Sequence, residues 1–202
     1  MVTTTTVSYP LLVLFGLTMP SGCKRPRPAP APLATCESLN SLTLGNQITV
    51  GVPPTNSFQP PTMDIGAHAF QLASGATATG GYAKIDNAGH AGGSGNEMQV
   101  NNIVTSISIG IGQTLQAVRF SFGEYGGNLN VSVNNSLANF PNFSNINGTA
   151  IGGVKVKVLS GGMGNDKGQI EFVGAMNDQM AGLGQLAVGG QELFIDDICF
   201  SK

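Results

Sequence analysis

Apolar and polar residues alternate along most of the chain from Leu39 onward. A period of two is typical of strands that bury one face and leave the other in water. The clearest runs place an apolar residue at every second position, at Val118, Phe120 and Phe122, at Leu129, Val131 and Val133, and at Val154, Val156 and Val158. Weaker alternation occurs at 107–111, 170–172 and 193–200. These runs predict about ten strands.

Turn-forming dipeptides separate the runs. Gly-Gly occurs at 80–81, 92–93, 126–127, 161–162 and 189–190, Asn-Gly at 147–148 and Pro-Pro at 53–54. No helix-length stretch has a period of 3.6 residues. The chain is therefore predicted to be all-β. An antiparallel two-sheet β-sandwich of jelly-roll type is the economical arrangement for residues 36–202, because it buries one face of each strand against the other sheet.

Composition supports one such domain. Hydrophobic residues make up 41% of the 202 residues, which is enough for a core. The Asn-rich stretch 134–147 has no clear period and contains Phe140 and Phe143. We expect these two rings to plug the core; the alternative is a long functional loop between the sheets.

The N-terminal segment predicts export. Residues 9–19 are an apolar run too short to span a bilayer as a helix, placed where a secretory signal has its hydrophobic core. The run leads into Pro20-Ser21-Gly22-Cys23, which resembles the bacterial lipobox, where small residues precede a lipidated cysteine. Residues 1–22 are thus predicted to be a lipoprotein signal peptide, with the lipid on Cys23. Cleavage near Ala34 and a mis-assigned start codon are the alternatives.

The cysteine count agrees with a lipid anchor. Three cysteines leave one unpaired in an exported protein unless Cys23 is acylated, and Cys36 and Cys199 are then the natural disulfide pair. Closing so long a loop is expected to contribute about 4 to 5 kcal/mol in the chain-entropy model. Residues 23–35 are rich in proline, which favours an extended spacer that holds the domain off a membrane.

Several stretches resemble known families. The ending GGQELFIDDICF, residues 189–200, is similar to the closing strand of galactose-binding-like jelly rolls, many of which are carbohydrate-binding modules. The stretches GGYAKIDNAG, GSGNEMQVNN, FGEYGGNLNVSVN and GGQELFIDDIC together resemble a broad group of uncharacterised exported bacterial proteins with a cysteine near each end of the domain. The first resemblance implies a jelly roll and hints at sugar binding, whereas the second implies export and no particular activity.

Two adjacent acids suggest a cation. Asp196 and Asp197 stand in an otherwise apolar strand, so one of them has to face inward or lie at a sheet edge. In the jelly-roll modules that this ending resembles, an Asp of the last strand often holds structural calcium with acids and carbonyls near the start of the domain, where Glu37 lies here. The resemblance thus implies calcium at Glu37, Asp196 and Asp197. Alternatively, one Asp is solvated and the other accepts turn hydrogen bonds.

Two glycine-rich segments have simpler interpretations. Residues 161–167 match the start of a calcium-binding repeat, but only one copy is present and Gly168 stands where that repeat has a large apolar residue, so a hairpin turn is predicted. Residues 88–95 lack the helix and lysine of a phosphate-binding loop. His68 and His90 have no metal-ligand spacing.

The sequence contains few features that would indicate an enzyme. The chain has no GxSxG-type nucleophile elbow. A glycosidase needs two facing carboxylates. The alternation predicts that the available acids lie mostly on wet faces or in turns; they include Glu97, Glu124, Glu171 and Glu192.

A turn between two predicted strands is the candidate ligand site. The segment FGEYGGNLN contains Glu124, Tyr125 and Asn128, and loops on a rigid sandwich are where such domains recognise ligands. Tyr125 and Tyr82 could stack on a sugar ring while the acid and the amide bind its hydroxyls. The alternative is that Tyr125 covers the sandwich edge, and the chain has no Trp, the usual sugar platform.

The low charge of the chain limits the kinds of partner it is expected to bind. Only 10% of residues are charged and the net charge is −2, which disfavours nucleic acid. We predict a non-catalytic exported lipoprotein that binds glycan or another extracellular ligand. The rival prediction is a structural or accessory subunit of an envelope assembly, whose polar loops dock on protein; a secreted hydrolase ranks third.

Overall fold

The computed structural model describes residues 35–51, 56–108, 113–174 and 182–202. In these ranges the protein has fifteen strands, one short 3-10 helix and no α-helix. The strands are β1 (Thr35–Glu37), β2 (Gln47–Thr49), β3 (Ser57–Phe58), β4 (Asp64–Ala69), β5 (Tyr82–Asn87), β6 (Asn96–Asn101), β7 (Ile103–Ser108), β8 (Ala117–Glu124), β9 (Leu129–Val133), β10 (Ser136–Phe140), β11 (Ala150–Ile151), β12 (Val154–Ser160), β13 (Asp166–Val173), β14 (Leu186–Gly190) and β15 (Leu193–Ser201). The strands beyond the predicted number include two-residue strands, which are too short to show an alternation.

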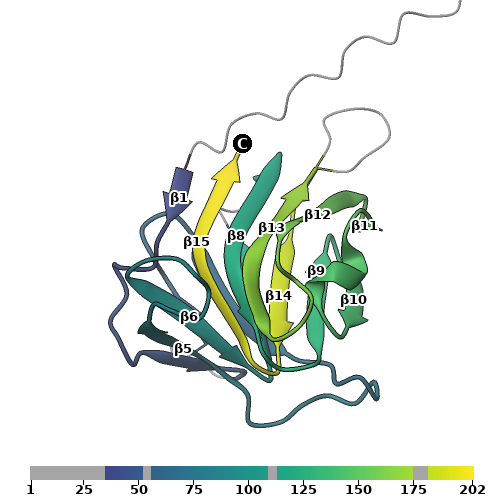
Figure 1. Cartoon of the computed structure of the whole chain (residues 1–202). Coiled ribbons are helices and arrows are strands. Elements are labelled where there is room, and N and C mark those ends of the chain that lie inside the picture. Colours follow the sequence, from purple (N-terminus) through teal and green to yellow (C-terminus); the bar gives the residue numbers. More distant parts are fainter. Residues whose placement is uncertain (1–34, 52–55, 109–112, 175–181) are drawn as a thin grey trace, which may run out of the picture. The chain divides into compact units, whose positions relative to one another are not determined.

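The strands form two antiparallel sheets. The nine-stranded sheet has the order β11-β12-β13-β8-β15-β6-β5-β2, and β1 pairs with β15 beside this path. The six-stranded sheet has the order β10-β9-β14-β7-β4-β3. Figure 1 shows β15, β8 and β13 side by side, with β14 and β9 in the other layer.

The core lies between the two sheets. All three predicted runs contribute their apolar positions to it, and Phe120, Phe122 and Phe172 are fully buried. Burying a side chain of this size is worth about 2 to 3 kcal/mol relative to leaving it in water. The prediction of an antiparallel two-sheet β-sandwich is confirmed. The jelly-roll part concerns the order of connections and stays a prediction.

The Asn-rich stretch closes one part of the core. It contains the 3-10 helix η1 (Phe143–Ile146), and Phe140 and Phe143 are both buried. The Phe143 ring lies 4.6 Å from the Phe122 ring, measured between centroids. The prediction that these rings plug the core is confirmed. The glycine-rich segment after β12 is the predicted turn, because it leads directly into β13, the antiparallel neighbour of β12.

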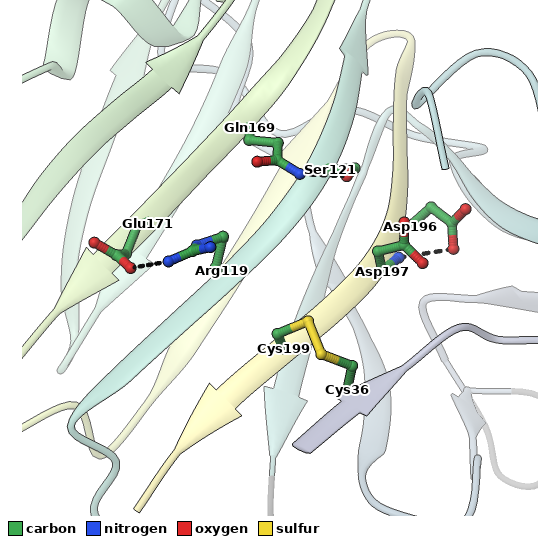
Figure 2. The surroundings of a disulfide bond; sticks show 8 residues. All are labelled: Cys36, Arg119, Ser121, Gln169, Glu171, Asp196, Asp197 and Cys199. Atoms are coloured by element: carbon green, nitrogen blue, oxygen red, sulfur yellow. Dashed lines mark hydrogen bonds and ion pairs between the residues drawn. A yellow bond between two sulfur atoms is a disulfide. The ribbon is translucent and has the colours of Figure 1, made fainter. Parts of the chain in front are cut away.

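A disulfide joins the first described strand to the last. Cys36 of β1 and Cys199 of β15 are directly paired in register, with a Cα–Cα distance of 3.9 Å (Figure 2). The predicted disulfide is therefore present.

The predicted signal peptide, Cys23 and residues 23–34 of the predicted spacer lie outside the described residues. Within the described ranges, no helix has the length and hydropathy needed to cross a membrane.

Candidate ligand-binding site

The outer face of the six-stranded sheet has small residues in its middle strands. One row of paired residues crosses this face from β10 to β4 in the order Leu137, Ser132, Ala187, Ser106 and Gly66. Side chains alternate between the two faces of a strand. Because Val131 and Val133, on either side of Ser132, belong to the core, the Ser132 row faces outward.

A second row lies beside the first. It crosses the same strands in the order Asn139, Asn130, Gly189, Val104 and His68. Gly189 must lack a side chain, because a Cβ atom there would overlap the carbonyl oxygen of Ile103. The short side chains of the middle strands therefore leave a depression along this face, whereas β10 and β4 carry longer side chains at its margins.

These rows form a groove of about 500 Å³, within the usual size range of small-ligand sites. Its lining consists of hydroxyl, amide, imidazole and small apolar groups from His68, Ala69, Gln71, Val104, Ser106, Ser108, Asn130, Ser132, Asn135, Leu137, Gln185, Leu186 and Ala187. Among the described residues, no Asp, Glu, Lys or Arg lines the groove. Such a surface suits an uncharged ligand with many hydrogen-bonding groups and some apolar surface.

His68 and Ser106 form an accessible polar pair in this groove. The Nε2 atom of His68 lies 2.8 Å from the Oγ atom of Ser106. A Cβ atom at Gly66 would lie 2.9 Å from that Oγ atom and 3.6 Å from Nε2, so the glycine keeps the space beside the pair free. Both groups can therefore exchange hydrogen bonds with ligand hydroxyls.

The sequence-predicted ligand residues do not form one patch. Tyr82 lies on β5, where its hydroxyl donates to Oε1 of Gln99 at 3.5 Å. Tyr125 follows β8, and β15 and β6 lie between β8 and β5 in the sheet. The Tyr125 hydroxyl donates to the carbonyl oxygen of His90 at 3.0 Å, and its ring packs edge-on against Phe194. This placement is what we expect of a ring that covers the sandwich edge.

Glu124 is buried and both of its oxygens are engaged. Its carboxylate accepts hydrogen bonds from the backbone N–H groups of Phe143 at 2.9 Å and Gly164 at 2.6 Å. Burial raises the pKa of Glu124, although these two hydrogen bonds act to lower it. The carboxylate thus holds η1 and the β12–β13 turn against β8. Glu124 and Tyr125 also line a smaller cavity of about 190 Å³.

Asn128 is only 3% exposed and points toward the groove wall. Its Nδ2 group donates to the backbone carbonyl of Gln71 at 3.0 Å. Gln71 in turn lines the groove. Asn128 therefore supports the groove through Gln71.

The glycine-rich loop 88–95 is folded around a buried carboxylate. Glu97 is 0% exposed and accepts hydrogen bonds from the backbone N–H groups of Gly89, His90 and Ala91 at 2.8 to 3.2 Å. The Nδ1 atom of His90 lies 2.7 Å from Oε1 of Glu97. The loop thus binds an anion supplied by the protein itself.

Glu97→Gln is expected to destabilise the protein by about 2 to 3 kcal/mol, because a neutral amide lacks the charge that these donors stabilise and places an NH2 group where Oε1 accepts from the backbone N–H of His90. Urea unfolding would measure the loss, and hydrogen exchange at residues 89–91 should become faster. Glu192→Gln, at an exposed position, is the matched control. Unchanged stability and exchange in Glu97→Gln would contradict this account.

The expectation that the acids lie mostly on wet faces or in turns is wrong for three of the four. Glu97, Glu124 and Glu171 are buried, and Glu192 is exposed. Glu171 is stabilised by Arg119 at 2.9 Å, as Figure 2 shows, and by Lys157 at 3.2 Å. Burial acts to raise the pKa of Glu171, but the hydrogen bonds and charges of these two cations outweigh it, so the pKa is lowered.

Asp196 is buried and Asp197 is partly exposed. Asp196 is paired with Ser121, whose neighbours in β8 belong to the core, so Asp196 lies on the outer face of the nine-stranded sheet, beneath Gly93. The expectation that one acid faces inward or lies at a sheet edge is therefore wrong, because a loop buries Asp196 on the outer face of a central strand. A register shift after Asp196 interrupts β15, and Asp197 adopts a φ of 49°. One oxygen of Asp196 accepts from the backbone N–H of Asp197 at 2.7 Å (Figure 2), and the other is buried without a hydrogen-bond partner. A Cβ atom at Gly93 would overlap that second oxygen.

The predicted calcium ligands are only partly together. Glu37 accepts a hydrogen bond from the hydroxyl of Thr62 at 3.0 Å. Within the described ranges, no three His, Cys, Asp or Glu side chains converge as a metal site would need. Burial raises the pKa of Asp196 to about 7, aided by the charges of Asp197 and Glu97. Calcium at Glu37, Asp196 and Asp197 stays a prediction, which the Asp196→Asn experiment below tests.

The groove residues were not predicted. They come from strands far apart in the chain, and most of them are single Ser, Ala, Asn or Gln residues that form no motif in the sequence. The available signal was the run of small neutral residues at outward positions of β7, β9 and β14, where an ordinary wet face carries Lys or Glu. Comparisons of this chain with protein-family models, with curated proteins and with solved structures found no match.

Proposed function

We propose that this protein is an exported, non-catalytic lipoprotein that binds an uncharged carbohydrate in the groove of its six-stranded sheet. The observation that carries the proposal is the lining of the groove, in which hydroxyl and amide groups surround a floor of small residues. None of the described residues that line the groove is an Asp, Glu, Lys or Arg. Sugars offer hydroxyl groups around their rings and apolar C–H faces, and both match this lining.

The geometry of the His68–Ser106 pair supports binding over catalysis. Acyl transfer by a serine needs backbone or side-chain donors directed at the developing oxyanion. Ser106 lies inside β7, which is paired on one side with β4 and on the other with β14. The N–H groups of a strand paired on both sides point along the sheet toward its neighbours and away from the groove.

Ala187→Phe should abolish carbohydrate retention, because its ring would fill the groove floor. Affinity electrophoresis of the full chain in gels containing cellulose derivatives, xylan, mannan or β-1,3-glucan would measure retention. We expect at least a tenfold loss of affinity with an unchanged melting temperature, since Ala187 faces outward.

Gln169→Phe is the matched control. Gln169 is exposed on β13 of the other sheet, so a phenylalanine there should leave retention unchanged. Failure of the wild-type protein to be retained by any neutral polysaccharide would refute the proposal. Retention unaffected by Ala187→Phe would place the sugar site elsewhere, and Tyr125→Ala would then test the smaller cavity that Glu124 and Tyr125 line.

A further inference from the structure

The segment that follows β4 crosses the outer face of the six-stranded sheet. We call residues 69–72 the strap. Ala69 still pairs with Ile103 of β7, whereas two residues later the backbone of Gln71 contacts Asn130 of β9. Because β14 and β7 lie between β9 and β4, the strap passes over both of them.

Three asparagine side chains fasten the strap. The carbonyl oxygen of Gln71 accepts hydrogen bonds from the Nδ2 groups of Asn128 at 3.0 Å, Asn130 at 2.9 Å and Asn139 at 2.8 Å. The N–H of Gln71 donates to Oδ1 of Asn130 at 2.7 Å, and Asn139 also donates to the carbonyl oxygen of Leu72 at 3.3 Å. These bonds hold the strap across the sheet, down to the edge strand β10.

The strap is also anchored at both of its ends. Phe70 is 1% exposed, so its ring is buried under neighbouring residues. Beyond the strap the chain folds back on itself, because Gln71 forms an isolated antiparallel bridge with Thr77 and the N–H of Ala78 donates to the carbonyl oxygen of Phe70 at 2.8 Å. The strap is therefore already in place before any ligand arrives.

We infer that the groove accepts the end of a carbohydrate chain, with the terminal sugar against the strap. This inference rests on the proposed function. The strap residues Ala69 and Gln71 line the groove beside His68, Val104 and Asn130, and so form a wall that the ligand meets at this end. A polysaccharide that continued past this wall in both directions would have to displace a segment held by four side-chain hydrogen bonds to Gln71 alone.

The hydrogen-bonding groups left free in this wall indicate which part of the ligand it can recognise. The side-chain oxygen and one N–H of Asn130 are hydrogen-bonded to the backbone of Gln71. The side-chain amide of Gln71, by contrast, makes only a 3.5 Å contact with the carbonyl oxygen of Gly75. The Gln71 amide and the His68–Ser106 pair are the groups that can bind the hydroxyls of a terminal sugar. The amide offers both a donor and an acceptor, which suits a free hydroxyl better than a substituted one.

The test uses cello-, xylo-, manno- and laminari-oligosaccharides titrated into the full chain by calorimetry. Each is offered unmodified, reduced to the alditol at its reducing end, O-methylated at its non-reducing terminal sugar, and in a much longer form. We expect one of the two terminal modifications to weaken binding about tenfold or more, and chain length beyond the groove to add nothing. Equal binding of both modified forms, or affinity that keeps rising with length, would overturn end binding while leaving the proposed function intact. Absence of binding by every sugar would instead remove the proposed function, and this inference with it.

Asn139→Ala probes the strap separately. Asn139 is exposed on β10 and is absent from the groove lining, so its loss should loosen the strap without changing the groove floor. We expect faster hydrogen exchange at residues 70–72 and a smaller difference between modified and unmodified sugar ends. Asn87→Ala, at an exposed position on β5, is the control and should change neither. Unchanged end discrimination in Asn139→Ala, despite faster exchange, would contradict the role of the strap.

Discussion

Asp196→Asn is expected to stabilise the protein at pH 8 and to leave its stability at pH 4 nearly unchanged. The pKa of Asp196 is raised from 3.8 to about 7 in the folded protein, chiefly by burial. Between these values the folded state binds one proton more than the unfolded state, so the free energy of unfolding decreases as the pH rises from about 4 to about 7. The shift corresponds to at most about 4 kcal/mol.

Asparagine removes this loss because it is neutral at every pH and keeps an oxygen for the N–H of Asp197. Urea unfolding at a series of pH values would measure the free energy of unfolding of both proteins. The wild-type curve should fall from pH 4 to pH 7, and the variant curve should lack that fall. Asp64→Asn, at an exposed position on the other sheet, should reproduce the wild-type curve.

The same variant tests the predicted calcium ion. A cation on Asp196 would favour the carboxylate and would reverse the sign of the effect. Asp196→Asn would then destabilise the protein in calcium, and a chelator would lower the melting temperature of the wild type. Stabilisation by Asp196→Asn at pH 8, with no response to chelator, would leave the buried carboxyl without a metal.

Loss of the Cys36–Cys199 disulfide is expected to cost about 3 to 5 kcal/mol of stability. The cross-link spans a sequence separation of 163 residues, and in the chain-entropy model a long loop removes much conformational freedom from the unfolded state. Among the described strands, β1 pairs only with β15, through three residue pairs (Figure 2). Without the covalent bond, β1 should therefore also separate from the sheet before the rest unfolds.

Urea unfolding with and without reductant would measure the first effect, and hydrogen exchange at residues 35–37 the second. The double variant Cys36→Ser/Cys199→Ser is the control, because its stability should match that of the reduced wild type and should not respond to reductant. Equal stability of the oxidised and reduced wild type would refute the expected contribution.

Much of the fold was predictable because the apolar positions of an alternating strand are the ones that become buried. Phe120, Val131 and Val156 lie in the core where the period of two placed them. What alternation could not reveal was which outward positions are truly wet. Glu97 and Asp196 lie at outward positions and are covered by the loop 88–95, and no local pattern records which loop folds over which strand.

By itself, the sequence determined the all-β fold class, the two packed sheets and the two cysteines that join the first and last described strands. Each of these depends on residue types or on a burial pattern that repeats locally along the chain. Only the tertiary structure decided where a ligand can bind. The groove needs Ala187, Gly189, Ser106 and Ser132 side by side, and the strap needs Gln71 to reach Asn130 and Asn139. These contacts depend on the order and register of strands distant in the chain, and strand register is set by the packing of the whole core.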